Sequence, residues 1–133
     1  MHRVTTTALI LVLLGCTHAD AVGASRTAPR KIVTLSLPRA ATENDLIRAI
    51  VTTGSLPAGM RLIARLPNGE VIGTIAPYGP NRAGSYTIAV PPHAVHDDNK
   101  VTMHFELRDR SGTVRAPDDT ELVKVELHVV PKK

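Results

Sequence analysis

The sequence predicts an all-β domain: a single antiparallel seven-stranded β-sandwich over residues 31–133, following a cleaved signal peptide. From Lys31 onward, short segments alternate apolar and polar residues, and Pro, Gly, Asn or Asp separates each segment from the next. Hydrophobic residues make up 43% of the chain and charged residues 21%, as in globular proteins. The 133 residues suffice for one core and are too few for two.

Two segments carry the clearest alternation. In 100–108 the residues predicted to point inward are Val101, Met103, Phe105 and Leu107. In 121–130 they are Val123, Val125, Leu127 and Val129. If these two strands pair with Glu106 opposite Lys124, His104 lies beside Glu126 and His128 beside Thr102, which would give both histidines a structural role.

Further strands are predicted on either side. Residues 60–66 and 70–76 flank Pro67-Asn68-Gly69, a turn whose Asn and Gly tolerate positive φ, so these segments form a β-hairpin. Residues 85–90 end at Pro91-Pro92, and a first strand over 31–37 ends at Pro38.

The segment 46–53 fits two structures. Its apolar residues have helical spacing between Thr42, a possible N-cap, and Gly54, a possible C-cap. Ile47, Ala49 and Val51 also alternate, and a strand here completes the seven strands of a sandwich. We predict a strand, with a single helix in an otherwise all-β domain as the alternative.

The layout over 31–130 resembles the immunoglobulin-like domains of bacterial envelope proteins. The resemblance is architectural, since the cysteine pair and core Trp of true immunoglobulin domains are absent and no functional residue carries over. The motifs Val71-Ile72-Gly73-Thr74-Ile75, Tyr78-Gly79 and Val129-Val130-Pro131 are also similar to the β-sandwich domains attached to bacterial tyrosinases.

The N-terminal segment is typical of an export signal. A short basic start precedes an apolar run over 8–14 that is too short to span a membrane, and Leu13-Leu14-Gly15-Cys16 resembles the lipobox of bacterial lipoproteins. That resemblance implies a signal peptide over 1–15, lipidation at Cys16, and attachment to the membrane through the lipid. Residues 16–30 would be a flexible tether. The alternative is cleavage after Ala21 and ordinary secretion.

Composition argues against several ligand classes. Trp is absent, and Tyr78, Tyr86 and Phe105 are the only aromatic residues, so stacking surfaces for sugars or single-stranded nucleic acid are not expected. The formal charge is +4, but the sixteen Lys and Arg are scattered along the chain, so no nucleic-acid partner is predicted. Cys16 is the only cysteine, so the domain has no disulfide.

One cluster could hold a metal ion. His93, His96, Asp97 and Asp98 lie within six residues after Pro91-Pro92, and imidazoles and carboxylates are ligands for zinc or copper. The alternative is a polar loop in which Asp97 and Asp98 are turn residues.

The chain has no nucleophile elbow, and its one thiol lies in the predicted signal, so an enzyme is not predicted and no cofactor is expected. The leading hypothesis is a non-enzymatic lipoprotein of the bacterial envelope, in the periplasm, whose sandwich binds an envelope protein as an assembly subunit or chaperone-like accessory. The alternatives are a periplasmic copper- or zinc-handling protein and a secreted soluble structural domain.

Overall fold

A computed structural model describes residues 29–76 and 82–133. The predicted signal peptide, Cys16 and most of the tether lie outside the described residues. The described part is all-β, with one 3₁₀ turn. Its elements are β1 (Lys31–Ser36), β2 (Asp45–Thr53), β3 (Arg61–Arg65), β4 (Val71–Ile75), β5 (Gly84–Val90), η2 (Pro92–Ala94), β6 (Lys100–Arg108), β7 (Val114–Arg115) and β8 (Leu122–Pro131).

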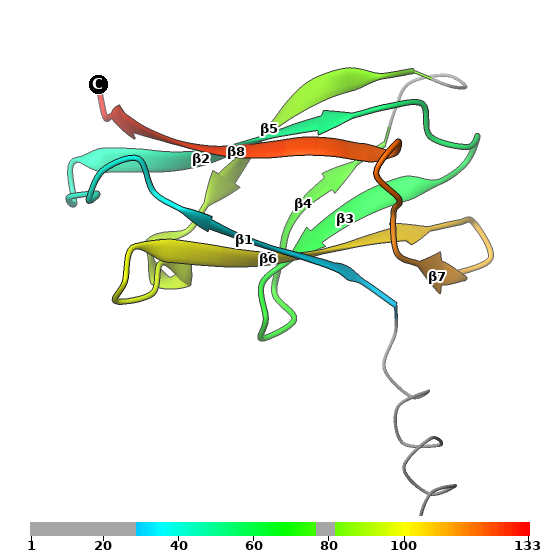
Figure 1. The fold of residues 1–133 in the computed structure, drawn as a ribbon, viewed down its shortest axis with the longest axis horizontal. Helices are drawn as coiled ribbons and strands as arrows, with labels where there is room; N and C mark the ends of the chain where they lie inside the picture. Colours follow the sequence, from blue (N-terminus) through cyan, green and yellow to red (C-terminus); the bar gives the residue numbers. More distant parts are fainter. Residues whose placement is uncertain (1–28, 77–81) are drawn as a thin grey trace, which may run out of the picture.

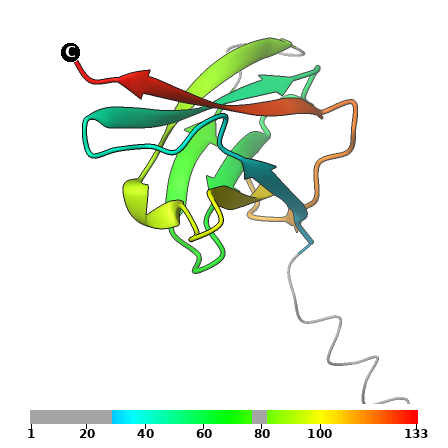
Figure 2. The ribbon, with the colours of Figure 1, turned by 60° about the vertical axis from the view of Figure 1, so that its left-hand side comes forward.

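The strands form two antiparallel sheets that lie face to face, giving a sandwich-like fold (Figures 1 and 2). One sheet has the order β1-β6-β3-β4, with β7 pairing β6, and the other has the order β5-β2-β8. Apolar side chains from both sheets share one core, including Phe105 and Met103 of β6 and Ala49 and Val51 of β2. Phe105 is the largest fully buried side chain, and most of the other buried core residues are aliphatic.

The predicted inward face of β6 is confirmed. Its four apolar residues, Val101, Met103, Phe105 and Leu107, are each 0% exposed. The strand is central, with β1 on one side and β3 on the other. Because side chains alternate along a strand, the polar residues that separate these four lie on the outer face of the sheet.

β6 does not pair with the last strand, so the condition for placing His104 beside Glu126 and His128 beside Thr102 is not met. β1 occupies one edge of β6, and β8 lies in the other sheet beside β2. Glu106 is therefore opposite Ile63 and Thr34 is opposite Thr102. His104 and His128 lie on different sheets. His128 is opposite Arg48, and its Nε2 is 3.3 Å from Glu126 Oε2.

Residues 45–53 form a strand, as predicted in preference to a helix. β2 pairs with β5 on one side and with β8 on the other, so its backbone groups are used in two ladders. Ala49 and Val51 point into the core and are 0% exposed. These long-range pairings outweigh the local helix signals.

The predicted inward position of Val123 is wrong, because the ladder between β2 and β8 is irregular. Thr52 is opposite Lys124, but Thr53 is opposite Leu122, so Val123 is the extra residue of a bulge. Leu122 takes the buried position and Val123 is 56% exposed.

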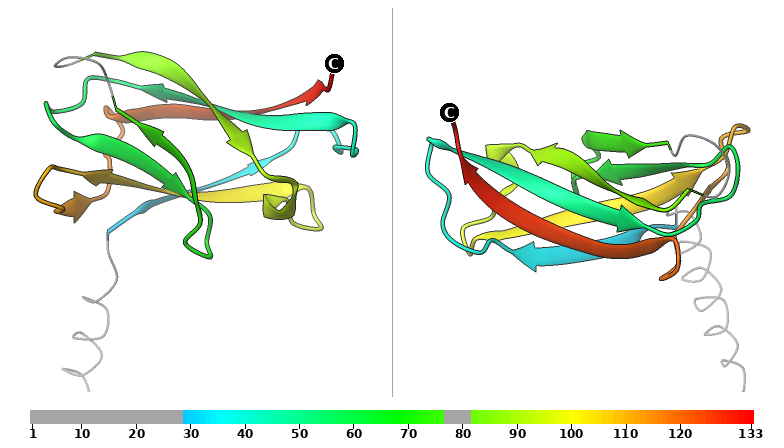
Figure 3. Two further views of the ribbon diagram at one scale, coloured as in Figure 1. Left: turned by 180° about the vertical axis from the view of Figure 1, so that it is seen from behind. Right: turned by 90° about the horizontal axis from the view of Figure 1, so that it is seen from above.

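The predicted hairpin is confirmed as β3 and β4, with Gly69 at φ +95° in the turn. β4 lies close to β5 of the other sheet (Figure 3). At the closest approach, a Cβ added to Gly73 would lie 2.7 Å from Ile88 Cδ1, so glycine permits this contact between the two sheets.

Candidate functional site

The C-terminus marks one end of the sandwich (Figure 1). A largely apolar pocket of about 640 Å³ lies at that end. Its base is formed where β2 begins and β5 ends. One wall is the β1–β2 loop and the other is the segment between β5 and β6. The apolar residues that line it include Leu46, Ile47, Val90, Pro92 and Val95. Charged residues at its margin are Glu43, Asp45, Arg48 and Lys132.

The register of β2 and β5 explains the mixed lining. Ile47 is opposite Val90 and Arg48 is opposite Ala89. Side chains of opposite residues share a face, so the first pair points toward the core and the second pair points outward. The pocket wraps around the strand ends and thus exposes apolar surface next to charged side chains.

Asp45 fixes the wall made by the β1–β2 loop. Its carboxylate accepts two hydrogen bonds from Arg39, at 2.8 and 2.9 Å, and two from Thr42, at 2.9 Å from the amide and 3.1 Å from the hydroxyl. The Arg39 guanidinium and then the Thr42 amide hold the pKa of Asp45 well below its usual range. Asp45 is therefore ionised at neutral pH and already paired within the loop.

A second contact joins this loop to the end of β8. The Lys132 amide donates to the Asn44 carbonyl, and Lys132 Nζ donates to the Glu43 carbonyl, both at 2.8 Å. The ammonium is thus oriented by a carbonyl group, and a cation remains at the margin of the pocket.

The residues predicted to bind metal belong to the segment that forms the opposite wall, but none of the four lines the pocket. Pro92 begins η2 and Val95 forms an isolated bridge with Val101, which fixes the segment to the core. His93 turns toward the β3–β4 hairpin, where its Nε2 is 2.8 Å from Glu70 Oε1.

The structure does not bring His93, His96, Asp97 and Asp98 together as a ligand set. Among residues 29–76 and 82–133, no group of three or more His, Cys, Asp and Glu is placed to hold a metal ion. The same segment instead contributes Pro92, Val95 and Asn99 to the apolar pocket. Sequence reasoning selected this loop for its imidazoles and overlooked its apolar residues.

β5 forms the edge of its sheet next to the pocket. It pairs with β2 and with no other described strand. Its seven residues, GSYTIAV, contain no charge and no Pro. Thr87 and Ala89 are exposed on its outer face. An unpaired edge of this kind offers free backbone groups to an added strand. The sequence identified the strand, but only the topology shows that it is an edge.

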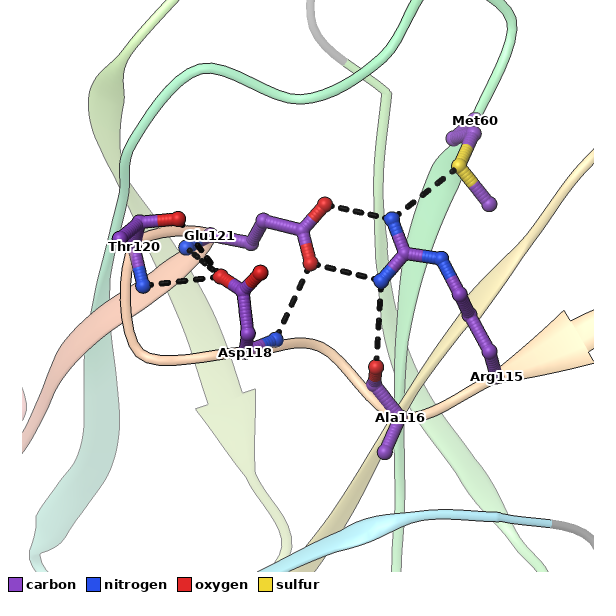
Figure 4. Close-up of polar contacts among 6 residues, drawn as sticks. All are labelled: Met60, Arg115, Ala116, Asp118, Thr120 and Glu121. Atoms are coloured by element: carbon purple, nitrogen blue, oxygen red, sulfur yellow. Dashed lines mark hydrogen bonds and ion pairs between the residues drawn. The ribbon is translucent and has the colours of Figure 1, made fainter.

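A network of polar and charged side chains lies near β7 (Figure 4). Arg115 donates to both carboxylate oxygens of Glu121, at 2.7 and 2.6 Å, and the Asp118 amide donates to one of them at 3.0 Å. Asp118 in turn accepts hydrogen bonds from Thr120. Since these groups satisfy one another, the network closes the loop before β8 and has a structural role.

No family model, curated protein or solved structure matches the chain. In the part of the chain that the structure describes, no helix has the length and apolar character needed to span a membrane.

Replacing Asp45 with Asn is expected to release the β1–β2 loop, because a neutral amide pairs more weakly with Arg39. Limited digestion with trypsin at neutral pH should then cut faster after Arg39. The matched control is Glu43→Gln, which removes a neighbouring exposed carboxylate. Equal cleavage rates for the native chain and Asp45→Asn would contradict the role given to Asp45.

Replacing Glu121 with Gln should lower the free energy of unfolding by about 1–2 kcal/mol at pH 7, a value kept low because Arg115 is 44% exposed. The hydrogen bonds from Arg115 lower the pKa of Glu121 below the usual 4.5. Its stabilisation is therefore present above pH 4.5 and is lost as the pH falls through the lowered pKa.

Urea unfolding at neutral and strongly acidic pH measures both effects. The difference between the native chain and Glu121→Gln should be full at neutral pH and smaller in acid, whereas Asp97→Asn, at an exposed turn, should change little. A difference that grew in acid would show that the sign is wrong.

Proposed function

We propose that this chain is an exported, non-enzymatic lipoprotein of the bacterial envelope that binds an extended segment of another protein along β5. One observation carries the proposal: an uncharged edge strand ends at an apolar pocket. An added strand would gain affinity from main-chain hydrogen bonds and specificity from a pocket that takes its side chains.

A comparison of the sheet edges favours β5. β8, the other edge of the same sheet, carries Lys124, Glu126 and His128 and ends with Pro131. In the facing sheet, β4 has five residues and a register irregularity opposite β3, and β1 begins with Lys31. Charges, bulges, Pro and short length are the features that protect edges from pairing. β5 has seven residues and none of these features.

The pocket is suited to apolar side chains of a bound segment, and its charged margin is suited to polar groups of that segment. Its volume of about 640 Å³ falls in the range of ligand pockets, and its lining is mostly apolar. Arg48 and Lys132 at the margin could pair with a carboxylate of the bound segment. The carboxylate of Asp45 already forms an ion pair with Arg39.

We propose further that the sandwich belongs to the immunoglobulin-like class with its terminal strands exchanged. In that class the second strand pairs with the fifth and the third with the sixth, as β2 does with β5 and β3 with β6. The last strand normally lies beside β6, a place that β1 occupies here. The exchange keeps the central strands in place and changes which strands form the edges.

Photo-crosslinking in whole cells tests the binding site. A photoreactive residue at Thr87 or Ala89 should give the same crosslinked partner, because both side chains lie on the outer face of β5. At His128, on the outer face of β8, that partner should be absent. The substitution Thr87→Lys should strongly reduce the product formed at position 89, since a charge protects an edge. Equal products at all three positions would refute an interface at β5.

Metabolic labelling with a palmitate analogue tests the lipid anchor. The native chain should incorporate label and Cys16→Ala should not, because the thiol is the attachment point implied by the lipobox-like sequence. Incorporation that is equal in the two chains would contradict lipidation at Cys16. A mature N-terminus after Ala21 would establish the secreted alternative.

A further inference from the structure

The outer face of the β1-β6-β3-β4 sheet gathers five cations that are far apart in the sequence. Arg61 is opposite Arg108, Arg65 is opposite His104, and Lys100 is opposite Ser36, so these side chains share the face turned away from the core. Arg30, just before β1, reaches the same face, where it lies 3.8 Å from Glu106. We call this surface the basic face.

Glu106 lies at the centre of the basic face and is 2% exposed. Its Oε1 accepts a hydrogen bond from Arg65 Nε at 2.8 Å and lies 3.5 Å from Arg108, while Oε2 faces Arg30. One carboxylate therefore serves three guanidinium groups. The Nε atoms of Arg30 and Arg108 and the Nδ1 of His104 are buried and make no hydrogen bond.

The basic face consequently has surplus charge. Arg61 and Lys100 form no ion pair with any described residue, whereas Arg39 and Arg115 elsewhere each pair with a carboxylate of their own. Five cations and one carboxylate give the basic face a formal charge of +4. Positive charge is thus concentrated on one face.

Two exposed aliphatic side chains lie among these cations. Ile32, 63% exposed, is opposite His104, and Val71, 48% exposed, is opposite Arg65. They are two of the four large exposed hydrophobic residues of the described chain. Aliphatic side chains surrounded by Lys and Arg are typical of surfaces that rest on lipid headgroups.

We infer that the basic face docks on an anionic lipid surface. The charge is complementary to anionic headgroups, to whose attraction several cations contribute together. The chain also enters the domain on this face, at Arg30, fourteen residues after Cys16. A tether of this length reaches at most about 50 Å, so a lipid at Cys16 would keep the domain near the membrane.

The lipid at Cys16 would supply the anchor, and the basic face would set how the domain lies on the membrane. In that orientation β5 lies in the sheet turned away from the membrane (Figure 1). The inference relies on the proposed anchor for proximity only, and the charged surface can be tested without any lipid on the protein.

The test uses the full-length chain with Cys16→Ser, which carries no lipid, and vesicles of phosphatidylcholine with or without phosphatidylglycerol. Co-sedimentation should be stronger with phosphatidylglycerol and should weaken as salt is added. The double variant Arg61→Gln, Lys100→Gln should bind the anionic vesicles more weakly by at least about tenfold. Neither residue has an ion pair to lose, so the fold should be intact, which circular dichroism checks. The N-terminal segment is the same in the parent chain and in every variant, so its contribution cancels when the chains are compared.

The matched control is Lys124→Gln, Lys133→Gln, which removes two charges from β8 and the terminus beyond it and should bind anionic vesicles like the parent chain. Equal binding to both vesicle types, or equal losses in the two double variants, would overturn the inference. So would tighter binding to a single-stranded oligonucleotide than to anionic vesicles. Because Cys16 is replaced throughout, failure here leaves the palmitate result at Cys16 unaffected.

Discussion

The packing of β6 across the core is the constraint on which the rest of the structure depends. Its apolar residues are fully buried against β2, and Phe105 is the largest of them. With no Trp in the chain, a mostly aliphatic layer around one fully buried phenylalanine holds the two sheets together. The same alternation places Glu106 and Arg108 on the opposite face. One strand therefore determines both the core and the centre of the basic face.

The placement of the terminal strands separates the surfaces of the domain. β1 lies beside β6 and β8 beside β2, so the β1–β2 loop must cross from one sheet to the other at the pocket end. Asp45 and the end of β8 then hold that loop as a wall of the pocket. The domain's first strand begins at the opposite end (Figure 1). β5 belongs to one sheet and the basic face is the outer face of the other, so a bound protein segment and a membrane would not compete for the same surface.

Local patterns in the sequence predicted most strands, because alternation and turn residues act over a few positions. The β3–β4 hairpin and β6 were predicted in this way, whereas a strand over 46–53 was preferred to a helix because it completes a sandwich. Strand pairing was not predicted, because two strands of suitable pattern can pair in several ways and only the complete packing selects one. The bulge at Val123 was missed for the same reason, since it exists only relative to β2.

The pocket and the basic face could not be predicted from the sequence, because only the fold brings their residues together. The cations of the basic face are scattered from Arg30 to Arg108, and register alone brings them together. The pocket combines a loop before β2 with a loop after β5, and the sequence drew attention to the histidines of the latter.

The most direct test of the account is NMR of the isotopically labelled domain with an extended peptide selected from a random library for binding to it. The account predicts that the peptide shifts the amide signals of β5 and the methyl signals of Leu46 and Val90, and protects β5 amides from exchange. Selected peptides that shift β8 or β4 and leave β5 unchanged would contradict it.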